Sequence, residues 1–190
     1  MSDSRPKVVQ IGFNKTGTSS LGRFFKQNGY KVGGGVGPAQ KILENINASK
    51  PPLLDINIDV LQDLEDHKNG LYAAKYYKEI FASHPESYFI LTTRCCEGWI
   101  NSRLRHNKGI YVERALKNHG IDDVELLKYK WREEFHRYHY EVIDYFYLRG
   151  RFFIHSLDSM NVERLVDFVS DHYDLTEKAD YPSANRTKKD

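Results

Sequence analysis

The feature that most constrains the fold is a short apolar run near the start of the chain, which ends on glycine and passes through a loop into an amphipathic segment. Residues 7–12 (KVVQIG) predict a buried strand. Residues 18–28 predict a helix whose apolar face carries Leu21, Phe24 and Phe25. A buried strand that leads directly into a helix is typical of folds built on a parallel sheet.

The rest of the chain continues this alternation of strands and helices. Apolar runs favour strands at residues 53–58, 70–74, 88–93 and 152–157, and periodic apolar spacing favours helices at residues 38–48, 76–82, 96–105, 122–148 and 162–169. We interpret the glycine-rich residues 33–37 as a flexible loop. The expected fold class is therefore α/β, with a central parallel sheet and helices on both of its faces.

Length and composition limit the organisation of the chain and its partners. The 190 residues contain no evident linker and predict one domain over residues 1–190, with residues 176–190 as a polar tail. A net charge of +2 argues against a nucleic-acid partner, and no apolar run is long enough to indicate a membrane span. The cysteines, Cys95 and Cys96, are adjacent and cannot staple the fold, so we expect a cytoplasmic protein.

The first loop has the composition of an anion-binding site. Gly12 and Gly17 have the G-x-x-x-x-G spacing that turns backbone N–H groups inward at a helix start. A Walker loop places its lysine directly after the second glycine, whereas here Lys15 lies two residues before it. No Walker-type aspartate is evident either. We therefore expect no metal and no magnesium-dependent phosphoryl transfer. Residues 12–20 are called the glycine loop below.

The glycine loop closely resembles the 5′-phosphosulfate loop of PAPS-dependent sulfotransferases, PAPS being 3′-phosphoadenosine 5′-phosphosulfate. The resemblance implies a P-loop NTPase-like sulfotransferase fold of the small bacterial type, with PAPS as co-substrate and PAP as product. It also implies that a lysine binds the phosphosulfate bridge and that the following amides hold the 5′-phosphate. The residues that carry the resemblance are Asn14, Lys15, Thr16, Gly17, Thr18, Ser19, Ser20 and Leu21, and all but Leu21 are expected to bind the co-substrate.

A second pair of polar residues follows the strand predicted at residues 88–93. Arg94 comes directly after this strand, and Ser102 lies within the next helix. An arginine there can form paired hydrogen bonds with phosphate oxygens. The pair resembles the motif of the same family that binds the 3′-phosphate of PAPS, a group that ATP lacks. The acidic residue and proline that commonly follow the arginine are replaced by Cys95 and Cys96.

The end of the chain resembles the short polar ending with which many bacterial-type sulfotransferases close over the nucleotide. Residues 184–190 read ANRTKKD. The resemblance implies that Lys188 adds positive charge near the 3′-phosphate and that residues 176–190 form a lid. A solvated basic tail is the alternative interpretation.

The group that accepts the acceptor's proton is less clear from the sequence. The family places a His, Glu or Asp just after an inner strand, but the corresponding stretch here holds Ala73 and Ala74. Asp55 and Asp59 are the substitutes, because they accompany the apolar run at residues 53–58. The alternative interpretation of each is a capping or surface aspartate.

These observations predict a sulfotransferase that moves the sulfuryl group of PAPS to a hydroxyl or amine of a small-molecule or carbohydrate acceptor. Lys15 would stabilise the charge that develops during transfer. Two alternatives stay open at this point. One is a nucleotide or small-molecule kinase with an atypical loop, and the other is a protein that binds PAP or PAPS without catalysis.

Overall fold

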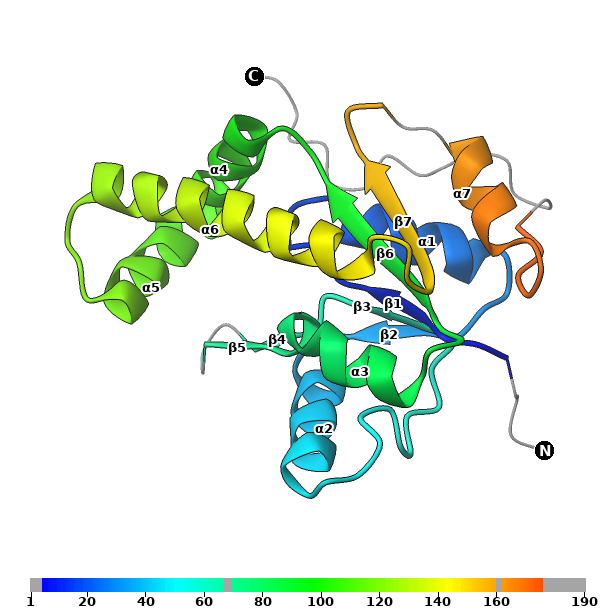
Figure 1. Cartoon of the computed structure of the whole chain (residues 1–190). Helices are drawn as coiled ribbons and strands as arrows, with labels where there is room; N and C mark the ends of the chain where they lie inside the picture. The colour runs from blue at the N-terminus through cyan, green and yellow to red at the C-terminus, as the bar shows by residue number, and fades with distance from the viewer. Residues whose placement is uncertain (1–4, 67–69, 160–161, 176–190) are drawn as a thin grey trace. The chain divides into compact units, whose positions relative to one another are not determined.

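A five-stranded parallel sheet forms the first of two compact units in the computed structural model, which describes residues 5–66, 70–159 and 162–175 (Figure 1). This sheet unit is built from the chain up to Thr93 and from Gly150 onward. The second unit spans Arg94–Arg149 and is helical. We call it the helical unit and describe each unit by itself.

The sheet has the strand order β2-β3-β1-β6-β7, and every pair is parallel. Its strands are β1 (Val8–Gln10), β2 (Val32–Gly34), β3 (Val60–Gln62), β6 (Tyr88–Thr93) and β7 (Arg151–Ser156). The chain turns to one side of β1 for β2 and β3 and to the other side for β6 and β7. Strand β1 therefore lies at the topological switch point, where α/β folds bind ligands beyond the carboxyl ends of the strands.

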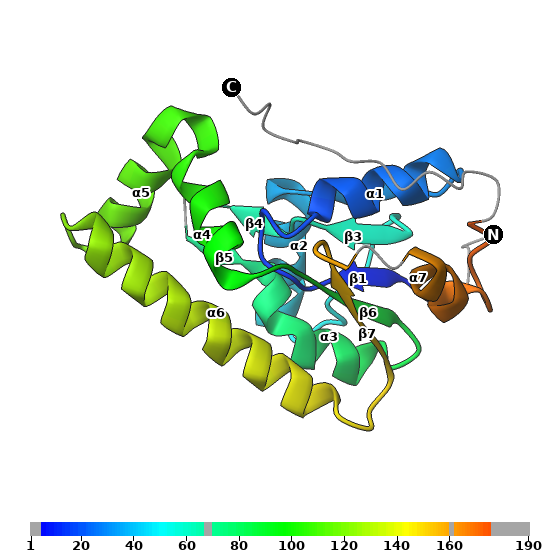
Figure 2. The same ribbon diagram turned by 90° about the horizontal axis from the view of Figure 1, so that it is seen from above.

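Helices cover both faces of this sheet, as the sequence predicts. Tyr88 and Ile90 of β6 belong to a core cluster with residues of α1 (Thr18–Gln27) and α7 (Val162–Val169). The intervening Phe89 points to the opposite face, because side chains alternate along a strand. Its ring lies 5.8 Å from that of Phe81 in α3 (Tyr77–Ser83). Figure 2 shows α1 and α3 on opposite sides of the strands.

Two of the secondary-structure predictions for residues 33–58 are wrong. Residues 33–37 are not a loop, because they hold the end of β2 and the start of α2 (Val36–Asn47). A Cβ atom on Gly34 would lie 1.6 Å from the carbonyl oxygen of Gln62, so glycine permits the close pairing of β2 with β3. Residues 53–58 form a turn and an irregular segment instead of an inner strand, and β3 follows them. Leu53 and Ile56 are buried without being in a strand, which explains the misleading apolar pattern.

The residues between β3 and α3 form a small separate sheet. Strands β4 (Glu65–Asp66) and β5 (Leu71–Tyr72) pair antiparallel, and Glu65 lies opposite Tyr72. A 3₁₀ turn at Ala73–Tyr76 then leads into α3. The strand predicted at residues 70–74 is thus present in shortened form, outside the main sheet.

The helical unit consists of α4 (Cys96–Leu104), a 3₁₀ turn (His106–Gly109), α5 (Ile110–His119) and α6 (Val124–Phe146). The buried residues of α6 are those whose spacing predicts the helix: Leu127, Trp131, Phe135, Tyr138, Val142 and Phe146. Asp123 caps its start by accepting the N–H of Glu125 at 2.7 Å. Within the described part of the chain, no helix is both long and apolar enough to span a membrane.

Residue Arg103 of α4 is the buried charge at the centre of the helical unit. Only 2% of its surface is exposed, and its guanidinium carbon lies 3.9 Å from the ring centroid of Trp99. The rings of Trp131 and Tyr111 lie 5.2 and 5.5 Å from the same carbon. Cation–π contacts of this kind join α4, α5 and α6.

The buried His155 of β7 predicts a loss of stability in mild acid. Its side chain is 2% exposed, and burial lowers its pKa to about 4. The unfolded chain therefore takes up this proton near pH 6.5, before the folded chain does. We expect the free energy of unfolding to be highest above pH 6.5 and to fall by about 3 kcal/mol by pH 4.

Urea unfolding followed between pH 7.5 and pH 4.5 would measure this dependence. In His155→Phe the free energy of unfolding should change less with pH. The same substitution at the exposed His119 should leave this pH dependence unchanged. The half-buried His139, whose pKa burial also lowers, should leave a smaller pH dependence of the same sign in His155→Phe. If the unmodified chain, His155→Phe and His119→Phe all show the same pH dependence of stability, His155 is not its source.

Candidate functional site

The glycine loop joins the carboxyl end of β1 to the first turn of α1. Gly17 is the N-cap of α1 with φ 99°, and Lys15 has φ 64°, so both lie in the left-handed region. A Cβ atom on Gly17 would lie 2.7 Å from a methyl carbon of Leu157, which together with its φ accounts for glycine at this position. The first N–H groups of a helix have no acceptor within it. This end of α1 is therefore suited to hold an anion.

A buried polar network supports the glycine loop from below. Gln10, Thr16 and Thr92 have no exposed surface. The Gln10 Nε2 donates to the Gly12 carbonyl and to the Thr92 hydroxyl, each at 2.7 Å. The Thr16 hydroxyl lies 2.8 Å from that of Thr92 and donates to the carbonyl of Phe13. The Thr16 side chain thus fixes the shape of the loop.

Because the glycine loop passes close to β6, one added methyl group at Gly12 should destabilise the fold strongly. A Cβ atom on Gly12 would lie 2.1 Å from the backbone oxygen of Thr92. We expect Gly12→Ala to lower the free energy of unfolding by about 2–3 kcal/mol. Gly37→Ala is the matched control, since no atom lies within 4 Å of its added Cβ in α2. It should raise stability by up to about 1 kcal/mol. Urea unfolding of both variants gives the comparison, and equal effects would contradict this view of the loop.

The structure brings the predicted loop residues into one turn but exposes only some of them. Asn14, Thr18 and Ser20 are buried, whereas Lys15 and Ser19 are half-buried. The N–H of Ser20 already donates to the Gly17 carbonyl at 3.0 Å. The surface that an anion could reach is therefore formed mainly by the Lys15 side chain, the Ser19 hydroxyl and the amides before Ser20.

The ammonium group of Lys15 lies in a partly dehydrated position close to a carboxylate. Burial lowers the pKa of Lys15, and the negative charge of Asp63 acts in the opposite direction. A nearby carboxylate favours the charged form of a lysine. The loop thus presents a cation beside an acidic neighbour.

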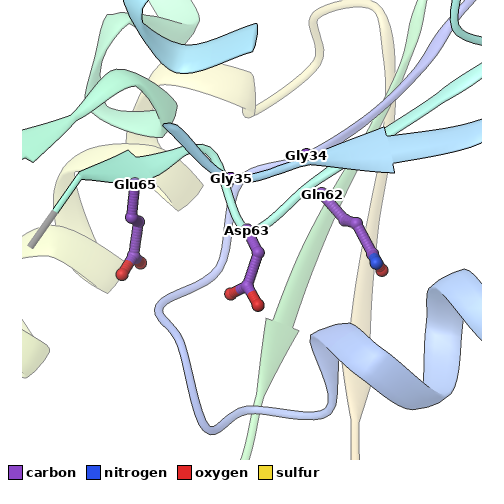
Figure 3. Close-up of a pocket in the computed structure, with 5 residues that line it drawn as sticks. All are labelled: Gly34, Gly35, Gln62, Asp63 and Glu65. Atoms are coloured by element: carbon purple, nitrogen blue, oxygen red, sulfur yellow. The ribbon is translucent and has the colours of Figure 1, made fainter. Parts of the chain in front are cut away.

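A pocket lies at the carboxyl ends of β2 and β3 in the sheet unit (Figure 3). It has a volume of about 320 Å³ and is lined by Gly34, Gly35, Gln62, Asp63 and Glu65. Glu65 is buried, and its Oε1 accepts the backbone N–H of Asn14 at 3.1 Å. Because Asn14 belongs to the glycine loop, this hydrogen bond places the pocket next to the loop.

The structure does not bring Asp55 or Asp59 to the glycine loop. Asp59 directly precedes β3, and its Oδ2 accepts the N–H of Lys31 at 2.8 Å. Its carbonyl accepts the N–H of Val8 at the start of β1. The strands are parallel, so this is the edge of the sheet opposite to the loop. Asp55 is exposed, with φ 62°, in the turns that lead to the same edge.

Sequence reasoning missed Asp63 and Glu65 because it placed the inner strand at residues 53–58. The strand is β3, and its carboxyl end is followed at once by Asp63. The short run VLQ in β3 is a weak strand signal. A useful signal would have been the acidic residues that cluster just after it, since parallel strands deliver such residues to the edge that binds ligands.

In the helical unit, the side chain of Arg94, which precedes α4, lies on the same face of this helix as Ser102. A Cβ atom on Gly98 would lie 3.1 and 3.2 Å from the Arg94 Nη2 and Nε atoms, so the guanidinium covers the helix at Gly98. Ser102 comes four residues later and therefore projects from the same face. The missing side chain of Gly98 leaves the room that the arginine occupies. This role of Gly98 had no distinct sequence signal.

Two further predictions concern the tail and metals. Lys188 and residues 176–190 lie outside the described residues. Among the residues that the structure describes, no group of three or more His, Cys, Asp or Glu side chains is arranged to hold a metal ion.

Comparison with known protein families gives one result. A family model for the sulfotransferase domain matches residues 7–180, which include both units described above. No curated protein matches the chain.

Proposed function

The chain belongs to the sulfotransferase domain family, and on this premise we propose that it transfers the sulfuryl group of PAPS to a hydroxyl or amine of a small-molecule or carbohydrate acceptor. PAP is the second product. The observation that supports this proposal best is the glycine loop, which places a left-handed Lys15 and Gly17 before the start of α1. Such a loop binds phosphate groups, and its lysine lies within it instead of after it.

In the proposed reaction, the amides of the glycine loop and the start of α1 hold the 5′-phosphate of PAPS. The Lys15 ammonium lies against the oxygen that bridges phosphorus and sulfur. When the bond between sulfur and this oxygen breaks, negative charge grows on the phosphate, and Lys15 stabilises it. Ser19 adds a hydroxyl donor. Asn14, Thr16, Thr18 and Ser20 give the loop its shape, and Thr16 and Thr18 offer their backbone N–H groups to the phosphate.

The 3′-phosphate is the proposed ligand of Arg94 and Ser102. Ser102 projects from α4, and the guanidinium of the preceding Arg94 lies over Gly98 on the same face, near the N-terminus of this helix. An arginine at a helix start binds a dianionic phosphate through charge and paired hydrogen bonds. We also propose that the tail, with Lys188, covers this end of the nucleotide. The adjacent cysteines Cys95 and Cys96 form no disulfide, which favours a reducing, cytoplasmic location.

The two rival functions are less well supported. A kinase of the P-loop type would need its lysine directly after Gly17, where the chain has Thr18. A protein that only binds PAP would not require a lysine at the bridge or a pocket beside it. Carboxylates line that pocket and adjoin the glycine loop through the Asn14 hydrogen bond.

A screen with sulfur-labelled PAPS tests the proposal. The purified chain is incubated with separate panels of phenols, sugars and amines, and labelled products are separated from PAPS. We expect label in at least one acceptor class, with one PAP formed for each sulfated product. If phosphate labelled in the γ position of ATP moves to an acceptor and the sulfur label does not, the chain is a kinase. If PAP binds and no acceptor is sulfated, the non-catalytic reading is correct.

A further inference from the structure

We infer that Asp63 is the catalytic base that takes the proton of the acceptor. This inference rests on the proposed function, which requires such a group and for which Asp55 and Asp59 lie at the wrong edge of the sheet. Asp63 was not among the residues that the sequence singled out. Its position, its backbone and its neighbours each support the assignment.

The position of Asp63 puts it beside the root of the glycine loop. It directly follows β3, which pairs with β1 through Val9 and Leu61. The loop directly follows β1, so the two segments leave the sheet at the same edge. The backbone N–H of Asp63 donates to Oε1 of Gln10, the last residue of β1, at 3.1 Å. Gln10 also supports the loop at Gly12.

The backbone of Asp63 is held in a conformation that few residues other than glycine adopt. Its φ is 49°. Its carbonyl accepts the N–H of Gly35 at 2.9 Å and that of Glu65 at 2.7 Å. Strained positions that the surrounding structure fixes in this way are concentrated at functional sites. Figure 3 shows the resulting direction of the Asp63 carboxylate, which points away from the strands toward the glycine loop.

The neighbours of Asp63 provide a place for the acceptor. Its charge acts on Lys15, the residue proposed at the bridging oxygen. The two charged groups are therefore near each other, and Asp63 also lines the pocket beside the glycine loop. Glu65 is a poorer base, since it is buried and its Oε1 is occupied by the N–H of Asn14. Asp63 is half-buried and can be reached from the pocket.

In the proposed step, Asp63 acts as the base in a displacement at sulfur. An oxygen of the Asp63 carboxylate takes the proton of the acceptor hydroxyl while the acceptor oxygen forms a bond to sulfur. The bond between sulfur and the bridging oxygen breaks, and its electron pair stays on the 5′-phosphate of PAP beside Lys15. Asp63 later releases the proton to water. No other reactant is needed.

The test compares two acceptors in Asp63→Asn, a change that keeps the size of the side chain and tolerates positive φ. Both are assayed at about pH 8.5, where phenol must still lose its proton during transfer and 4-nitrophenol is already largely ionised. We expect the rate with phenol to fall on the order of 10²-fold. The rate with 4-nitrophenol should change only about 3-fold or less, because an ionised acceptor has no proton to lose. Asp55→Asn is the matched control and should change neither rate.

Calorimetry with PAP separates the possible failures. If Asp63→Asn binds PAP normally and slows both phenols equally, Asp63 is not the base. A loss in Asp55→Asn with none in Asp63→Asn also overturns the inference. Should wild type use neither phenol, sulfate release from PAPS to water gives the same comparison, and an unchanged rate in Asp63→Asn overturns it. Failure of wild type to bind PAP at all would refute the proposed function itself.

Discussion

Replacing Lys15 with alanine should slow sulfuryl transfer on the order of 10³-fold while the affinity for PAP changes less than about tenfold. Lys15 is half-buried, and its left-handed backbone places it within the glycine loop before Gly17. In the proposed reaction the ammonium acts mainly on the bridging oxygen, where charge grows only as the bond to sulfur breaks. The amides at the start of α1, which we propose to hold the 5′-phosphate, are kept in the variant, so binding should persist.

The comparison needs the transfer rate and the affinity in the same protein. Single-turnover transfer from bound PAPS gives the rate, and calorimetry with PAP gives the affinity. Lys15→Arg is the conservative partner, because it keeps the charge but spreads it over a larger planar group. It should retain more activity than Lys15→Ala. A loss confined to affinity would show that Lys15 only binds the nucleotide.

Replacing Arg94 with alanine should weaken PAP binding by about 2–4 kcal/mol and leave ADP binding nearly unchanged. Only PAP carries the 3′-phosphate that Arg94 is proposed to hold. The guanidinium already lies over Gly98 on the first turns of α4, so little ordering of the side chain is needed when the phosphate arrives.

Matched titrations of PAP and ADP measure this difference. Arg114→Ala removes the same charge from an exposed position of α5 and should not affect either ligand. Ser102→Ala should weaken the binding of PAP by about 1 kcal/mol, as expected for the loss of one hydrogen bond. If Arg94→Ala weakens PAP and ADP equally, Arg94 does not read the 3′-phosphate.

The parts of the fold with strong local patterns were predictable. Strand β6 is a run of β-branched and aromatic residues, and its predicted bounds are confirmed. Helix α6 buries the six side chains whose spacing predicts it. The glycine loop was predictable because its two glycines have the G-x-x-x-x-G spacing and an amphipathic helix follows them. The family match confirms the resemblance drawn from it.

The parts decided by tertiary contacts could not be predicted. Strand β3 has only three residues and forms because β1 and β2 pair with it on both sides. Helix α5 buries only Tyr111, so it lacks a clear apolar stripe. The pocket carboxylates Asp63 and Glu65 depend on the position of β3 and were missed with it. In each case a neighbouring element supplies the stabilisation that the local sequence lacks.

The most direct test of PAPS dependence is the affinity of the unmodified chain for PAP and for ADP, measured by calorimetry in the same buffer. PAP has a 3′-phosphate that ADP lacks, and ADP has a second phosphate at its 5′ end that PAP lacks. We predict that PAP binds at least about 30-fold more tightly, which corresponds to about 2 kcal/mol. Equal affinities, or tighter binding of ADP, would contradict the account that this chain is built to use PAPS.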